Sequence, residues 1–234
     1  MKRRVFFGAA TAALVCMALV LTGCDNGNGN GGAAGFLGTT MELSGQVYEQ
    51  TWDANDNPVF TRYDGTREIT SIRLRAGDGT DIPFPVSGAI TGGQLGLTVG
   101  TPPPAAMVNI GDIFVGGDIL NEELFDNFNI SDRTVRALAL WSLWIEPGLG
   151  IWRERFAANV HEGVIFVYVE SDVTVSGNGR ATPWEDGYYT ITRNFNLNFR
   201  AGWNAVRFTI EDLDIGGRET ITLGNPANFR WIMD

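Results

Sequence analysis

The chain has 234 residues, of which 44% are hydrophobic and 11% aromatic, and its formal net charge at pH 7 is -10. These proportions allow one large or two small domains to bury a core. The acidic balance argues against nucleic acid and the anionic face of a membrane as binding partners.

The N-terminus carries the pattern of an export signal. Residues 1–4 supply a positive start, and residues 5–21 form an apolar run without charge. The sequence Leu21-Thr22-Gly23-Cys24 then places a cysteine after small residues. This pattern predicts a signal peptide over residues 1–23. The alternative is an uncleaved membrane anchor, because residues 5–20 approach the ~20 apolar residues that a spanning helix needs.

The segment from Leu21 to Cys24 resembles the lipobox of bacterial lipoproteins, which reads Leu, small residues and then Cys. The resemblance implies that Cys24 is diacylated on its sulfur and acylated on its amine, palmitate being a typical chain. Several acyl chains give stable anchoring, whereas a single chain gives marginal binding. The resemblance therefore implies a protein of the bacterial cell envelope that meets a membrane through Cys24. Asp25 resembles an inner-membrane retention signal of some Gram-negative bacteria, but inner and outer membrane both stay open.

Residues 24–39 are predicted to link this anchor to the folded part. The stretch 25–35 holds only Asp, Asn, Gly and Ala, so it behaves as a flexible coil with an r.m.s. reach of roughly 15 to 20 Å. Cys16 leaves with the signal and Cys24 carries lipid, so no disulfide is expected. Lys2 is the only lysine. Its removal with the signal excludes Schiff-base and P-loop lysine mechanisms.

From residue 40 onward the sequence is typical of an all-β protein, because short β-branched or alternating runs are separated by Gly, Pro, Asn and Asp. In the first unit, residues 40–101, strands are expected at 42–51, 58–63, 69–75, 82–86, 88–91 and 94–99. Three successive prolines mark residues 102–107 as a stiff linker and candidate domain boundary.

The second unit, residues 108–234, repeats this pattern with longer strands. They are expected at 110–115, 133–145, 150–156, 164–170, 173–176, 188–200, 205–211, 221–223 and 229–233. One short helix is expected at 121–128, where Asn121 can cap and two glutamates lie in the first turn. Residues 133–145 also fit a helical period, although the flanking turns favour a strand.

Short segments of the first unit, 44–48 and 53–59, resemble the opening of transthyretin-like and carboxypeptidase regulatory-like repeats. Other short segments resemble parts of uncharacterised spirochaete lipoproteins: residues 88–102, 172–177 and 202–204. The resemblance implies one or two small antiparallel β-sandwich units displayed in the envelope. It carries no catalytic residues with it.

The polar turn before Pro58 offers a weak calcium candidate. Asp53, Asn55 and Asp56 supply hard oxygen ligands, and the segment is similar to the cadherin calcium linker. The spacing to the proline differs and further acidic motifs are missing, so an ordinary polar turn is the favoured interpretation. No other cofactor is expected.

The sequence favours a protein that is not an enzyme. His161 is the only histidine, which excludes two-histidine zinc sites, and position 165 is Ile where a metalloprotease motif needs a second His. His161 and Glu162 are expected in a loop before a strand. Acidic residues are abundant, so a glycosidase-like carboxylate pair stays open.

The strongest candidate binding residues are Trp184, Tyr188 and Tyr189, which lie beside carboxylates in a predicted loop. Flat rings with polar neighbours suit sugars or a protein hot spot. A structural role is the alternative, because adjacent tyrosines of a strand face opposite sides. The other tryptophans of the second unit are expected in the core: Trp141, Trp144, Trp152, Trp203 and Trp231.

Three functions follow from these patterns. The first is a lipid-anchored envelope protein whose β modules bind glycan or protein, which predicts a solvated aromatic patch. The second is a structural or assembly subunit without a small ligand, which predicts an exposed edge strand, with residues 229–233 as a candidate. The third is a glycan-active enzyme, which needs paired carboxylates in a cleft.

Overall fold

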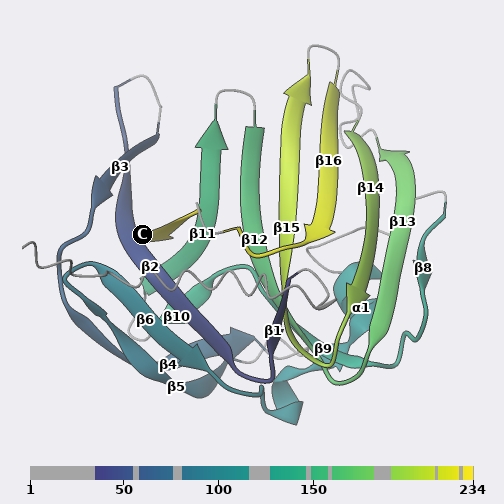
Figure 1. The fold of residues 1–234 in the computed structure, drawn as a ribbon, viewed down its shortest axis with the longest axis horizontal. Coiled ribbons are helices and arrows are strands. Elements are labelled where there is room, and N and C mark those ends of the chain that lie inside the picture. The colour runs from purple at the N-terminus through teal and green to yellow at the C-terminus, as the bar shows by residue number, and fades with distance from the viewer. Residues whose placement is uncertain are drawn as a thin grey trace, which may run out of the picture.

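The computed structural model describes residues 35–54, 58–75, 81–115, 127–145, 149–157, 160–181, 191–213, 216–226 and 229–233. The described chain is all-β, as predicted: its strands belong to one 17-stranded sheet with a single turn of 3-10 helix and one short α-helix, α1 (Figure 1). The strands do not form small sandwich units, because successive pairings carry one curved sheet around two cores.

The elements follow in this order. The first half contains β1 (Phe36–Gly38), β2 (Met41–Trp52), β3 (Pro58–Arg62), β4 (Arg67–Arg75), β5 (Asp81–Thr91), β6 (Gln94–Val99), η1 (Pro104–Ala106), β7 (Val108–Asn109) and α1 (Ile110–Val115). The second half contains β8 (Asn129–Ile130), β9 (Arg136–Leu140), β10 (Leu143–Ile145), β11 (Leu149–Ala157), β12 (Val160–Val169), β13 (Val173–Ala181), β14 (Ile191–Phe199), β15 (Gly202–Leu213), β16 (Gly216–Leu223) and β17 (Arg230–Met233).

Part of the sheet closes on itself. Strand β2 pairs with β6, and the ladder continues through β5, β4, β10, β11 and β17 before it returns to β2. This ring encloses the first core, to which inward residues of these strands contribute, among them Met41, Ile72, Leu97 and Trp231. Strands from both sides of residues 102–107 therefore pair with one another and share one core, and Ala106 and Met107 are buried in it.

Strand β12 forms a wall between the two cores. Val164, Phe166 and Tyr168 belong to the first core. Ile165 and Val167 alternate with them and belong to the second core. Because side chains alternate across a strand, burial on both faces gives the continuous apolar run that the sequence shows here. Strands β9 and β15 flank this wall and also divide their side chains between the two cores.

Two expectations for the second half are corrected by the structure. Residues 110–115 are helical rather than extended, because Ile110 and Ile113 lie one turn apart and both are buried in the second core. Residues 133–145 do not form one strand: β9 ends at Leu140, and β10 begins at Leu143 after a bend. The helix expected at 121–128 falls mostly outside the described residues.

The described helices are short. Helix α1 has six residues, and none in the described ranges has the length and apolar character of a membrane span. Residues 1–34, which hold the predicted signal peptide, Cys24 and most of the predicted tether, lie outside the described part of the chain.

Candidate functional site

An aromatic hollow, which we call the tryptophan hollow, lies where β9 passes into β10. Its volume is about 520 Å³, and it is lined by Arg73, Asp81, Ala139, Leu140, Trp141, Ser142 and Trp144. Trp141 is 39% exposed and Trp144 is 50% exposed, although both are large apolar side chains. Two solvated indole rings therefore border one concave surface.

The strand pattern explains why Trp144 points outward. Leu143 and Ile145 on either side of it are buried in the first core, and alternation along β10 then directs Trp144 to solvent. The bend between β9 and β10 places Trp141 at the other side of the hollow, where its ring centroid lies 5.9 Å from that of Phe208. Trp144 therefore lies on a strand that is paired on both sides, and Trp141 lies at the bend before it.

An ion pair supplies the polar part of the tryptophan hollow. Arg73 on β4 pairs with Trp144 on β10 in the sheet register, so both side chains occupy one surface. Arg73 Nη1 donates to Asp81 Oδ2 at 3.2 Å, and both side chains are about half exposed. The faces of aromatic rings can stack on C–H groups, and a guanidinium and a carboxylate can form hydrogen bonds with hydroxyl groups. The hollow therefore suits a ligand that carries both kinds of group.

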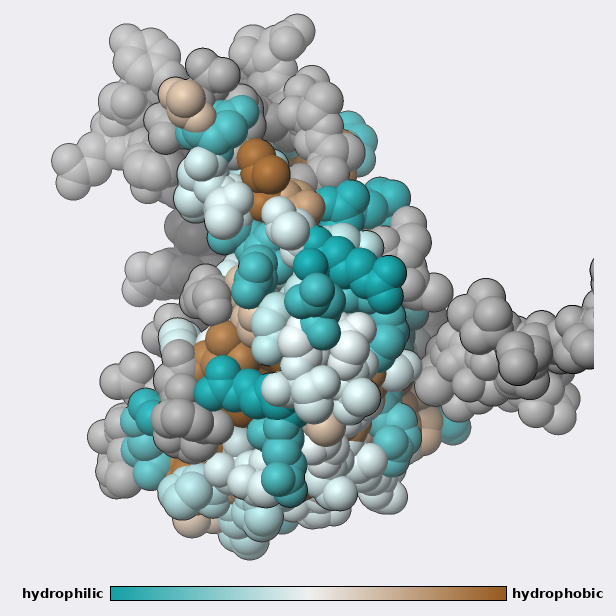
Figure 2. Space-filling model, turned by 90° about the vertical axis from the view of Figure 1, so that its left-hand side faces the viewer, coloured by the Kyte–Doolittle hydropathy of each residue, from teal (hydrophilic) through white to brown (hydrophobic). Residues whose placement is uncertain are grey.

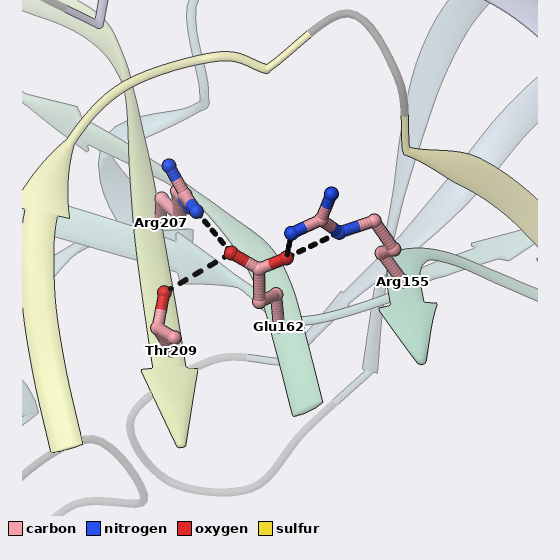
Figure 3. Close-up of polar contacts among 4 residues, drawn as sticks. All are labelled: Arg155, Glu162, Arg207 and Thr209. Carbon is pink, nitrogen blue, oxygen red and sulfur yellow. Dashed lines mark hydrogen bonds and ion pairs between the residues drawn. The ribbon is translucent and has the colours of Figure 1, made fainter. Parts of the chain in front are cut away.

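A second cluster surrounds Glu162 near the start of β12 (Figure 3). The Glu162 side chain is 1% exposed and forms ion pairs with Arg155 of β11 and Arg207 of β15. Thr209 Oγ1 donates a further, longer hydrogen bond to the carboxylate at 3.4 Å. Both guanidinium groups also lie over the ring of Phe229, at 5.9 and 6.0 Å.

These contacts keep Glu162 ionised. Burial raises the pKa of its carboxyl, but the hydrogen bonds and charges of Arg207 and Arg155 lower it by more, so the pKa lies below the usual 4.5. A general acid needs a raised pKa. Glu162 is therefore suited to holding three strands together and unsuited to donating a proton to a sugar.

A buried arginine lies near this cluster. Arg153 is 8% exposed; it donates to Asn225 Oδ1 and the Pro226 carbonyl, and its guanidinium carbon lies 5.6 Å from the centroid of Trp231. Burial lowers the pKa of Arg153 to about 10, so the side chain remains charged at neutral pH. These contacts connect β11 to the segment before β17 and give Arg153 a structural role.

The structure separates the tryptophans that the sequence grouped as core. Trp203 and Trp231 are buried, as predicted, and Trp152 is partly buried. The prediction for Trp141 and Trp144 is wrong, because the bend after β9 and the outward position on β10 expose them. The alternation Leu143, Trp144, Ile145 was the signal in the sequence that could have found one of them.

The remaining predicted site residues are only partly covered. Trp184, Tyr188, Tyr189, Cys24, Asn55 and Asp56 lie outside the described residues. Asp53 is described and follows β2 directly, with an exposed side chain. His161 and Glu162 lie within β12, not in a loop before it. Among the described residues, no group of three His, Cys, Asp or Glu side chains is placed to hold a metal ion.

Comparison with known proteins gives no relative: no family model matches the chain, and neither a curated protein nor a solved structure matches it.

Proposed function

We propose that this protein is a lipid-anchored protein of the bacterial cell envelope that binds glycans in the tryptophan hollow. The lipobox pattern at Leu21 to Cys24 supports the location in the cell envelope and the lipid anchor. The hollow supports the binding role, because it combines exposed aromatic faces with hydrogen-bonding groups on a rigid sheet.

The observation that carries the glycan proposal is the exposure of Trp141 and Trp144 around one concavity. Leaving an indole in water forfeits the stabilisation that its burial would give, so two such rings beside Arg73 and Asp81 favour a ligand-binding role. Asp81 is the single carboxylate among the described lining residues. Those residues thus supply hydrogen bonds and stacking but no acid and base pair for hydrolysis.

Glycan-array binding by the full chain tests this function. The protein is held in micelles of lauryldimethylamine oxide, a detergent without sugar groups. We expect the wild type to bind at least one envelope or environmental polysaccharide and Trp144→Ala to bind it at least tenfold more weakly, as loss of a stacking ring predicts. The matched control is Trp52→Ala, because Trp52 is 63% exposed but does not line the hollow.

Two results would contradict glycan binding in the hollow. One is an array on which the wild type binds nothing. The other is binding that Trp144→Ala leaves unchanged, since the ligand would then lie elsewhere on the protein.

The alternative of an assembly subunit is favoured by one observation. Strand β3 pairs with β2 and with no other described strand, and Trp52 and Val59 beside this edge are exposed. Figure 2 looks onto the side of the molecule where β3 lies, and hydrophobic residues form separate patches there among hydrophilic ones. The strand at 229–233 does not offer such an edge, because β17 is paired with both β11 and β2.

Sedimentation velocity distinguishes this alternative. An unprotected edge strand promotes association, and a lysine on it opposes association. If β3 mediates assembly, the full chain in the same micelles will form larger species that Val59→Lys dissociates. A wild-type chain that sediments as a monomer at all concentrations would reject the assembly role.

A further inference from the structure

A second surface, on the other side of the fold from the ring, is made almost entirely of uncharged polar side chains. It is formed by nine outward residues of β16, β14, β13 and β8, the strands at the right of Figure 1, and Arg218 of β16 lies next to it and is paired with Glu211. We call it the amide face, and its members are Thr220, Thr222, Asn194, Asn196, Asn198, Thr174, Ser176, Asn178 and Asn129.

Sheet register arranges these residues in rows. Asn194 is the register partner of both Thr220 and Asn178. Ser176 is the partner of both Asn196 and Asn129. Neighbouring strands lie roughly 4.8 Å apart and alternate residues of a strand roughly 6.8 Å apart, so the polar groups form a regular two-dimensional array.

The opposite side of the same strands is apolar. Phe195, Leu197 and Phe199 of β14 are buried in the second core, and Val175 of β13 and Ile221 of β16 lie beside them. This core fixes the backbone and thereby the positions of the outward amides. The array is therefore held in place before any ligand arrives.

The amino-acid choice is unusual for an exposed strand. Asparagine is depleted in β-strands, yet β14 places Asn at three successive outward positions. The amides keep hydrogen-bonding capacity. Thr174 Oγ1 donates to Asn198 Oδ1 at 3.0 Å and Asn127 Nδ2 to Asn178 Oδ1 at 3.1 Å, which uses carbonyl oxygens and leaves the Nδ2 donors of Asn178 and Asn198 available.

The amide face ends in a hollow of about 260 Å³. Ser131, Thr174 and Asn198 line the side that continues the face, and Asp172 and Arg200 add one negative and one positive side chain. These two charges cancel within the hollow. A hollow with donors, acceptors and no net charge suits the terminal unit of a neutral polymer.

We propose that the amide face binds an extended, uncharged polysaccharide whose end enters this smaller hollow. Charge matching supports the occupant: the nine residues of the face carry no charge, the neighbouring Arg218 of β16 is paired with Glu211, and a chain with a net charge of -10 repels anionic polymers. A protein partner would require apolar or aromatic anchors, and the nine residues of the face include none. This site shares no lining residue with the tryptophan hollow and is independent of the function proposed there.

Affinity electrophoresis of the full chain in lauryldimethylamine oxide micelles tests the amide face. The neutral probes are hydroxyethylcellulose, galactomannan and dextran, and carboxymethylcellulose serves as the anionic counterpart of the first. We expect at least one neutral polymer to retard the wild type, and carboxymethylcellulose to retard it less. Asn196→Asp keeps the shape of the side chain but removes its donors and adds a charge, so it should weaken retardation about tenfold.

Two control variants distinguish binding at the amide face from a general effect of charge and from binding in the tryptophan hollow. Thr91→Asp adds the same charge at an exposed position of β5 and should bind as the wild type does. Trp144→Ala removes a ring from the tryptophan hollow, so a loss of binding in this variant that Asn196→Asp does not share would place the polymer in that hollow. Equal losses in Asn196→Asp and Thr91→Asp would overturn the proposal, as would loss of binding in Trp144→Ala alone. Absence of retardation by every neutral polymer would also overturn it, and wild-type dimers that Asn196→Asp dissociates would assign the face to a second copy.

Discussion

Buried and exposed tryptophans of the same sheet have opposite surroundings. In the first core, Trp203 Nε1 donates to the Gly100 carbonyl and Trp231 Nε1 to the Ser44 carbonyl, each at 2.9 Å. In the tryptophan hollow, the rings of Trp141 and Trp144 are open to solvent. The first pair connects the second half of the chain to the first half through hydrogen bonds, whereas the second pair is partly exposed to solvent. The comparison teaches that an aromatic residue in an apolar strand is buried only where its side of the strand faces a core, since β10 is paired on both sides and Trp144 is still exposed.

The largest expected effect is on the buried side of this comparison. Trp231→Ala should lower the free energy of unfolding by about 3 to 5 kcal/mol, because it opens a cavity in the ring and leaves the Ser44 carbonyl without its donor. Urea unfolding followed by circular dichroism measures this. Trp52→Ala, at an exposed site, is the control and should stay within about 0.5 kcal/mol of the wild type. Equal losses in the two variants would show that burial does not separate the two classes.

Glu162 lies between these extremes, since its carboxylate is buried while its arginine partners are about 40% exposed. Glu162→Gln should cost about 1 to 3 kcal/mol, because Arg155 and Arg207 lose their counter-charge. The lowered pKa means that the ionised carboxylate stabilises the fold above the usual value of 4.5. That contribution is lost as the pH falls through the folded pKa.

Urea unfolding of wild type and Glu162→Gln across the pH range checks this sign. The difference in unfolding free energy should be constant above about pH 5 and should shrink at lower pH. Glu49→Gln, which removes an exposed carboxylate of β2, is the matched control. A difference that grows on acidification would mean that the carboxyl is protonated in the folded protein.

The smallest expected effect is on the exposed side. Trp144→Ala should lower the free energy of unfolding by about 1 kcal/mol, because half of the side chain is already in water. The same variant is expected to lose glycan binding, so stability and binding should separate at this residue. A loss of several kcal/mol in urea unfolding would instead mean that the ring belongs to the core.

Local patterns of the sequence were sufficient for the all-β fold class and for most of the strands. β-branched runs between turn residues predicted the strands, and the unbroken apolar run of β12 is what burial on both faces requires. The same reasoning placed Ile110 and Ile113 in a strand, because spacing over six residues cannot distinguish a short helix from a strand when the partner surface is unknown.

By itself, the sequence determined an all-β chain, and it predicted correctly that Trp203 and Trp231 are buried. The export signal that ends at Cys24 stays a prediction. Only the tertiary structure decided that β17 joins β2 and β11 to close a ring, that Trp141 and Trp144 border a hollow with Arg73 and Asp81, and that Asn side chains from several strands form one face. The physical reason is that hydrophobicity and turn chemistry act over a few neighbouring residues. Strand partners are chosen by contacts between residues far apart in the chain, and those contacts decide which side of each strand is covered.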